Sequence, residues 1–121
     1  AIATAAAYAA PTGSASAVQR LDEQTPHGFQ LEQNFPNPFN PSTTLRFSIP
    51  DERTVELRIV DVLGREVAVL VRKQMQPGSY SVEWNASALP SGMYVAVLRA
   101  WSLNGKQGRV FIETKKLLMQ K

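Results

Sequence analysis

Short runs in which apolar and polar residues alternate fill most of the chain after residue 43. In the run Thr-Leu-Arg-Phe-Ser-Ile every second residue is apolar, which places Leu45, Phe47 and Ile49 on one face. The runs at residues 54–60 and 79–84 repeat this alternation. Successive side chains of a strand point to opposite faces, so a period of two predicts strands that are buried on one face.

Turn signals separate these runs at regular intervals. Asp61 and Gly64 are expected in a tight hairpin, because Gly tolerates the positive φ that such a turn requires. Pro77-Gly78, Pro-Ser-Gly at 90–92 and Asn104-Gly105 mark further turns, and a last strand follows them. About seven antiparallel strands result, which predicts an all-β fold, an immunoglobulin-like β-sandwich. The chain has no Cys, so this sandwich has no disulfide.

One expected strand, within residues 89–101, has apolar residues on both faces, and we expect it in the centre of a sheet. The other strands have one apolar face each, and two layers bury these faces against each other. The predicted core consists of Leu45, Phe47, Ile49, Val55, Leu57, Ile59, Val82, Trp84, Val95 and Val97.

The first 24 residues differ from the rest, because they are rich in Ala and carry no charge before Arg20. Two interpretations remain open. The segment is either the end of a secretory signal peptide, with Ala15 and Ala17 at a cleavage site, or a linker or arm. No Met or basic stretch precedes it, which favours the second. We therefore expect an Ala-rich arm or linker at 1–24 and a β-sandwich domain at 25–121.

Composition and charge narrow the class of protein. A length of 121 residues predicts one domain, and 44% hydrophobic residues are ordinary for a soluble chain. The net charge is +3, and between residues 99 and 121 six Lys and Arg stand against one Glu. These cations alternate with apolar residues along expected strands, so a solvated face and a basic tail are favoured over a nucleic-acid patch. No apolar run reaches the roughly 18 residues of a membrane-spanning helix.

No constellation of residues predicts catalysis or metal binding. His27 is the only histidine, and nothing completes a triad or a metal cluster with it. Asp61, Arg65 and Glu66 gather at the hairpin, where such carboxylates more often cap backbone amides than act as acid and base. A glycine loop that cradles phosphate is also missing. We expect no enzymatic activity, no cofactor, no small-molecule substrate and no nucleic-acid partner.

Four aromatic residues offer a further alternative, because Tyr80, Trp84, Tyr94 and Trp101 could form a platform for a carbohydrate. Three of them lie in alternating strand patterns and are expected in the core, which leaves Trp101 as the exposed one. Asn85-Ala86-Ser87 matches a glycosylation sequon, a short pattern with many false matches.

The stretch Asn-Phe-Pro-Asn-Pro-Phe-Asn-Pro, residues 34–41, precedes the first clear strand. Proline lacks an N–H and keeps the residue before it extended, so this proline-rich segment is excluded from a helix and largely from a central ladder. Its Asn side chains can close local turns. The rings of Phe35 and Phe39 are expected to cover an open end of the sandwich, and the segment protects the edge of the first strand.

From about residue 31 to residue 121 the chain resembles the type A C-terminal sorting domain of the type IX secretion system. The resemblance rests on the proline-rich segment with the following Ser-Thr-Thr, on Asp-Val-Leu-Gly-Arg-Glu-Val, on Leu-Pro-Ser-Gly-Met-Tyr and on the terminal Thr-Lys-Lys-Leu-Leu-Met-Gln-Lys, in family order. The residues that carry the family motifs are Asn37, Pro38, Phe39, Asn40, Pro41, Asp61, Gly64, Arg65, Pro90, Gly92 and Tyr94.

The resemblance implies a non-catalytic export signal with an immunoglobulin-like fold at the end of a longer protein. The type IX machinery would recognise it in the periplasm and lead it across the outer membrane, and a sortase-like protease would remove it. The product would be secreted or held at the cell surface. The residues that the machinery reads would be Lys115, Lys116, Leu117, Leu118 and Lys121.

Residues 1–24 fall outside the resemblance and do not look like a junction between cargo and signal. The chain is then either a piece of a longer protein or a self-assembling surface or filament subunit. In the second case the Ala-rich arm would add a strand to another copy of the chain. Under the sorting hypothesis, deletion from Lys115 onward should abolish export of a fused reporter and leave the sandwich folded.

Overall fold

The alternating runs form strands that pack as two antiparallel sheets in a computed structural model, which describes residues 14–15, 18–22, 26, 28–102 and 110–121. The predicted Asn104-Gly105 hairpin and His27 lie outside these residues. The strands are β1 (Ser14–Ala15), β2 (Gln19–Asp22), β3 (Gln30–Leu31), β4 (Ser42–Ile49), β5 (Arg53–Asp61), β6 (Glu66–Met75), β7 (Gly78–Asn85), β8 (Gly92–Trp101) and β9 (Phe111–Met119).

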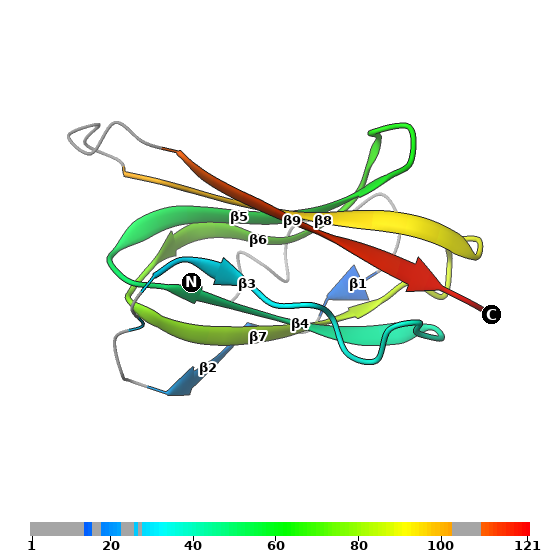
Figure 1. Cartoon of the computed structure of the whole chain (residues 1–121), viewed down its shortest axis with the longest axis horizontal. Coiled ribbons are helices and arrows are strands. Elements are labelled where there is room, and N and C mark those ends of the chain that lie inside the picture. Colours follow the sequence, from blue (N-terminus) through cyan, green and yellow to red (C-terminus); the bar gives the residue numbers. More distant parts are fainter. Residues whose placement is uncertain (1–13, 16–17, 23–25, 27, 103–109) are drawn as a thin grey trace.

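The two sheets face each other across one core (Figure 1). The first has the order β1-β7-β4-β3, and β2 also pairs with β7. The second has the order β6-β5-β8-β9. The predicted all-β sandwich is therefore confirmed, with β8 between two neighbours as its two apolar faces indicated. The three short strands β1, β2 and β3 lie in stretches for which no strand is expected from the sequence.

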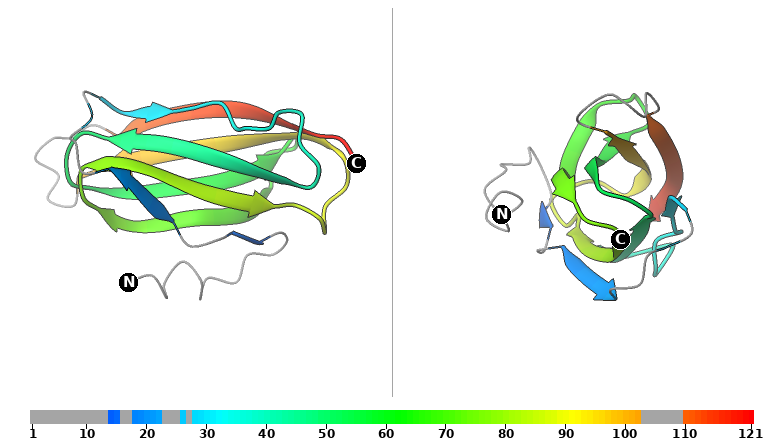
Figure 2. Two further views of the ribbon diagram at one scale, coloured as in Figure 1. Left: turned by 90° about the horizontal axis from the view of Figure 1, so that it is seen from below. Right: turned by 90° about the vertical axis from the view of Figure 1, so that its left-hand side faces the viewer.

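The arm predicted at the N-terminus contributes two of these short strands. Ser14 of β1 pairs with Asn85, and Gln19 of β2 pairs with Ser81, so both strands lie in succession along one edge of β7. Figure 2 shows them side by side with β7 in the first sheet. The described part of the arm thus covers an edge of its own sandwich.

The core prediction holds for eight of its ten residues, which are all buried, and is wrong for Val95 and Val97. These two lie half-buried on the outer face of β8, while Ala96 and Leu98 point into the core. Most residues on both faces of this strand are apolar, but Arg99 shares the face of Val95 and Val97 and marks it as the outer one. Tyr94 and Ala100 are buried on the same inner face as Ala96 and Leu98.

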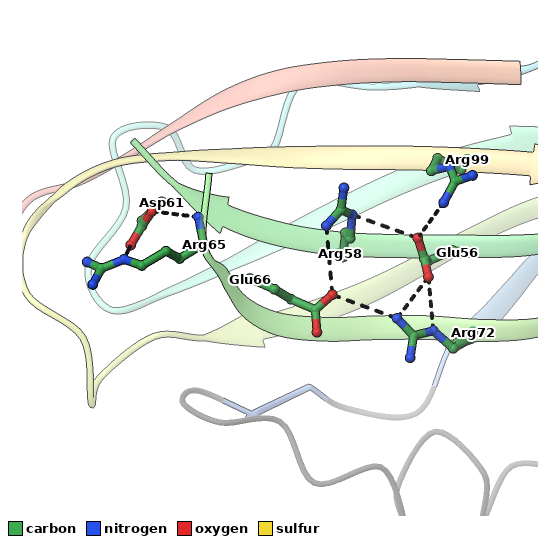
Figure 3. A network of polar contacts seen from close by, with 7 residues as sticks. All are labelled: Glu56, Arg58, Asp61, Arg65, Glu66, Arg72 and Arg99. Atoms are coloured by element: carbon green, nitrogen blue, oxygen red, sulfur yellow. Dashed lines mark hydrogen bonds and ion pairs between the residues drawn. The ribbon is translucent and has the colours of Figure 1, made fainter. Parts of the chain in front are cut away.

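The outer face of the second sheet carries an ion-pair network around Glu56 (Figure 3). The alternation along β5 places Glu56 on the solvent side, but the residue is only 8% exposed. Arg72 lies 2.8 Å from its carboxylate, Arg99 3.4 Å and Arg58 3.7 Å. The arginine side chains therefore cover the carboxylate and satisfy its charge, which allows an acidic residue to be nearly buried on a sheet surface.

The edges of the sandwich are protected by different means. Strand β6 is a long edge strand, and its register shifts twice against β5, between Leu57 and Arg58 and between Ile59 and Val60. Bulges of this kind twist an edge and hinder pairing with another chain. Strand β9, at the other edge of the second sheet, has no such shift in its pairing with β8. The C-terminal end of its outer edge is covered instead by the proline-rich segment.

Candidate functional site

The proline-rich segment, residues 34–41, closes one side of the sandwich between β3 and β4. Phe39 is 2% exposed, and its ring centroid lies 5.7 Å from that of Trp84. Phe35 is 80% exposed. The prediction that both rings cover an end of the sandwich is confirmed for Phe39 and wrong for Phe35. Phe35 pairs through its backbone with Thr44 of β4, so its main chain is fixed while its ring points away from the core.

The same segment binds the C-terminal end of β9. The N–H of Phe39 donates to the carbonyl of Leu118 at 2.9 Å, and the N–H of Gln120 donates to the carbonyl of Phe39 at 3.0 Å. The N–H of Leu118 donates to Oδ1 of Asn37 at 3.1 Å. Phe39 and Met119 form a parallel bridge. Two stretches about 80 residues apart in the sequence are thus joined by hydrogen bonds along the outer edge of β9.

Buried polar groups hold the proline-rich segment in shape. The side-chain amide of Asn34 donates to Oγ1 of Thr43 at 2.9 Å and to the carbonyl of Pro36 at 3.0 Å. The Thr43 hydroxyl donates to the same carbonyl at 2.9 Å. At the far end of the segment the carbonyl of Pro41 accepts from the N–H of Ala86. The bond of Asn34 to Pro36 is a local turn of the kind expected for the Asn side chains of this segment, whereas neither Asn34 nor Thr43 is among the residues named for the family motifs.

The tail, residues 115–121, alternates between core and surface. Leu117 and Met119 are fully buried, Lys115 and Leu118 are half-buried, and Lys116 is exposed. One predicted recognition residue, Leu117, is therefore a core residue. The burial of Leu117 and Met119 argues against the expectation that the sandwich stays folded after deletion from Lys115, because that deletion also removes these two side chains from the core.

The last residue of the tail is held by the turn that connects β7 and β8. The N–H of Lys121 donates to Oγ of Ser91 at 2.9 Å, and its ammonium group donates to the carbonyl of Ser87 at 2.9 Å. No ion pair joins Lys115, Lys116 or Lys121 to a carboxylate among the described residues. The charges of the tail are therefore not neutralised within that part of the chain.

The hairpin between β5 and β6 is fixed by Asp61, as its place in the sequence indicated. Its carboxylate accepts hydrogen bonds from the N–H groups of Leu63 at 2.9 Å and Arg65 at 3.0 Å, and from the Arg65 guanidinium at 2.8 Å (Figure 3). Gly64 has a φ of 82°, a conformation that favours glycine. Asp61 is thus a turn cap, and Arg65 and Glu66 do not form an acid–base pair with it.

These bonds to the charged form lower the pKa of Asp61 below its ordinary value of 3.8, with the Arg65 backbone N–H as the largest cause. Because the folded pKa is depressed, the cap is fully formed above that value and is lost as the pH falls through the folded pKa. We expect the amide signals of Leu63 and Arg65 in NMR spectra to titrate with a midpoint below 3.8. The Asp61→Asn variant should show no such titration. A midpoint above 3.8 would contradict the cap.

The Leu-Pro-Ser-Gly-Met-Tyr motif forms a tyrosine corner. The hydroxyl of Tyr94 donates to the carbonyl of Pro90 at 2.6 Å, four residues earlier, and Gly92 between them has a φ of 152°. Burial of the ring, and secondarily the nearby charge of Asp61, raise the pKa of Tyr94, so the hydroxyl stays a donor at neutral pH. Tyr80 bonds the carbonyl of Gln76 in the same way at 2.7 Å. The spacing Gly-X-Tyr, which occurs in both places, is the sequence signal that could have predicted these bonds.

The family motifs lie together at one end of the sandwich, which we call the motif end. It contains the proline-rich segment, the β5–β6 hairpin, the β7–β8 turn and the tail (Figures 1 and 2). Asp61 pairs with Tyr94, and Gly92 pairs with Met119, so the strands themselves bring these stretches together. Motifs that are far apart in the sequence thus form one surface.

The motif end does not have the composition of a catalytic or metal site. No group of three or more His, Asp or Glu that could hold a metal ion occurs in the described residues. Trp84, Tyr80 and Tyr94 are buried as predicted, so they form no carbohydrate platform. Trp101 is half-buried, and Arg99 stacks over its ring. In the part of the chain that the structure describes, no helix is long and apolar enough to cross a membrane.

A protein-family model matches most of the chain. The family model described as "secretion system C-terminal sorting domain" matches residues 33–113, which include the proline-rich segment, the hairpin and the tyrosine corner. The tail lies beyond the matched residues. The chain matches no curated protein. The matched region covers more than half of the chain, and the chain therefore belongs to the type IX secretion C-terminal sorting domain family, a non-catalytic family that directs secreted and cell-surface proteins across the outer membrane.

Proposed function

We propose that the secretion machinery recognises this domain through its tail, and that the proline-rich segment holds the tail in a fixed position for that purpose. The observation that carries the proposal is the set of hydrogen bonds that join Asn37 and Phe39 to Leu118 and Gln120 of the tail, two of them donated by the tail. A tail fixed in this way loses little conformational entropy when it binds a receptor. In this proposal the proline-rich segment holds the tail in place for the receptor.

The residues of the tail divide between two tasks in this proposal. Leu117 and Met119 hold β9 in the core, while Lys116 and Lys121 are exposed to a receptor and Leu118 is half-buried beside them. Exposed charges at the border of an interface mainly govern the association rate and the choice of partner. Lys115 is half-buried and contributes less surface to a partner than Lys116.

The test is an export assay in a bacterium with a working type IX system, in which the whole chain is fused behind an exported reporter. We expect the K116A/K121A variant to lower the secreted fraction about tenfold, the effect of losing about 1.4 kcal/mol of binding free energy. Immunoblots of medium and periplasm measure the fraction. Both residues are exposed, but the variant loses the hydrogen bond from the Lys121 ammonium to Ser87, so stability should fall by no more than about 1.5 kcal/mol.

The matched control is R46A/K73A, which removes two cations from β4 and β6, outside the tail and the β7–β8 turn that holds it. This variant should be secreted like the parent chain. Equal loss of secretion in both double variants would mean that only the total charge matters and would contradict recognition by the tail.

A sortase-like protease that separates the domain from its cargo is part of the same proposal, whereas contact between copies of the chain belongs to an alternative. Family membership supports the protease. The alternative function, a self-assembling subunit whose arm adds a strand to another copy, has less support, because β1 and β2 pair with β7 of their own chain. An assembly that disappears when residues 1–24 are removed would favour this alternative.

A further inference from the structure

A pocket opens at the motif end between the β5–β6 hairpin and the β7–β8 turn. Its volume is about 470 Å³, and its walls are mainly apolar, with Val67, Leu89, Pro90 and Met93 among the lining residues. The charged atoms of Asp61 at its rim are already bonded to Arg65 and to two backbone N–H groups. A polar ligand would therefore find few free hydrogen-bonding groups here, whereas an apolar side chain would be favoured.

Two exposed apolar side chains of the hairpin also line this pocket. Val62 is 72% exposed and Leu63 is 74% exposed, although both lie in a short turn. The turn is not loose, because the backbone pairs Asp61–Arg65 and Gly64–Asp61 and the Asp61 carboxylate fix it. Apolar side chains held rigidly in solvent, next to an apolar pocket, are typical of a protein-binding surface.

The pocket is continuous with the tail, whose lysine side chains make this part of the surface positively charged. Ser91 lines the pocket and accepts a hydrogen bond from the N–H of Lys121. Met93 of the pocket pairs with Leu118, two residues from Lys116. Neither Lys116 nor Lys121 makes an ion pair within the described residues. The combined surface is thus apolar at the hairpin and positive along the tail.

We propose that the hairpin residues Val62 and Leu63, the pocket beside them and the tail form one docking surface for a segment of the secretion receptor that carries a large apolar side chain flanked by carboxylates. The apolar side chain enters the pocket, and the carboxylates face Lys116 and Lys121. This inference rests on the proposed function, since it names the chemistry of the receptor that reads the tail. A second copy of the chain is a poor occupant, because it would present the same positive surface.

The export assay with the whole chain behind the reporter also tests this surface. We expect the V62S/L63S variant to lower the secreted fraction at least about tenfold, because truncating central apolar contacts commonly has this effect. The control is Phe35→Ser, which removes an equally exposed apolar side chain from the proline-rich segment, outside the proposed surface. It should be secreted normally. Purified V62S/L63S should unfold at the temperature of the parent chain, which separates a binding defect from misfolding.

The charge of the receptor segment is tested by reversing the charges of Lys116 and Lys121 and comparing this variant with the one that only removes them. K116E/K121E should be secreted less than K116A/K121A, because like charges then face each other. If the two tail variants are secreted equally, the acidic character of the receptor segment is refuted. If V62S/L63S is secreted like the parent chain while K116A/K121A is not, the hairpin surface is refuted and recognition by the tail stands.

Two further outcomes bear on the occupant. Normal secretion of K116A/K121A together with loss for V62S/L63S would overturn the tail as the recognised element and keep the hairpin contact. Sedimentation of the parent chain at about 100 µM should show a monomer. A stable dimer has a Kd far below this concentration, so it would be detected. A dimer that V62S/L63S dissociates would identify a second copy as the occupant and overturn the proposal.

Discussion

Replacing Phe39 by Ala should destabilise the domain by about 3–5 kcal/mol, the range typical of a buried Phe. The ring is almost completely buried against Trp84, and its backbone binds Leu118 and Gln120. Loss of the ring leaves a cavity between the proline-rich segment and the core, which also loosens the tail. Urea unfolding followed by tryptophan fluorescence measures the effect, with the slope of the transition as a check that unfolding stays cooperative.

Phe35→Ala is the matched control, because it makes the same truncation in the same segment. Its ring is in solvent, so the free energy of unfolding should change by no more than about 0.5 kcal/mol. Two equal effects would mean that the burial of Phe39 does not govern the stability of the motif end.

Deletion of residues 115–121 should unfold most of the domain. The deletion removes Leu117 and Met119, both fully buried, and each such loss costs about 2–5 kcal/mol. Domains of this size have a total stability of about 5–15 kcal/mol, so the two losses together remove much or all of it. The deletion also removes the pairing of β9 with Gly92–Ala96 of β8. Circular dichroism and a thermal melt measure the loss.

A shorter deletion separates folding from recognition. Removing only residues 120 and 121 breaks the hydrogen bond from Gln120 to Phe39 and those of Lys121, each worth about 0.5–1.5 kcal/mol. The sandwich should stay folded, since neither residue is in the core. If the chain without residues 115–121 melts like the parent chain, then the end of β9 is not required for the core.

The expected outcomes of the two deletions determine how an export defect is interpreted. A large truncation of the tail removes both a recognition element and part of the core, so loss of secretion alone would not show which of them the machinery needs. Substitutions at Lys116 and Lys121 keep the core intact and report on recognition. Substitutions at Val62 and Leu63 do the same for the hairpin.

The strands and turns follow from the sequence because they depend on neighbouring residues. A period of two locates β4, β5 and β7 together with their buried faces, and Asp61 and Gly64 locate the hairpin through the chemistry of a few adjacent residues. The resemblance to sorting domains likewise rests on short contiguous motifs. Local patterns in the amino-acid sequence are therefore enough to determine the fold class and the family.

Only the tertiary structure decided how deeply each side of β8 is buried: Ala96 and Leu98 pack fully between the sheets, whereas Val95 and Val97, on the face of Arg99, stay half-buried. The tertiary structure also decided that Phe39 is buried while Phe35 is exposed. It likewise decided that arginine side chains cover Glu56 and that Leu117 lies in the core. Each depends on partners far away in the sequence, as the bond between Asn37 and Leu118 shows. Local patterns carry no information about such partners, so the joining of the proline-rich segment to the tail could be found only in the folded chain.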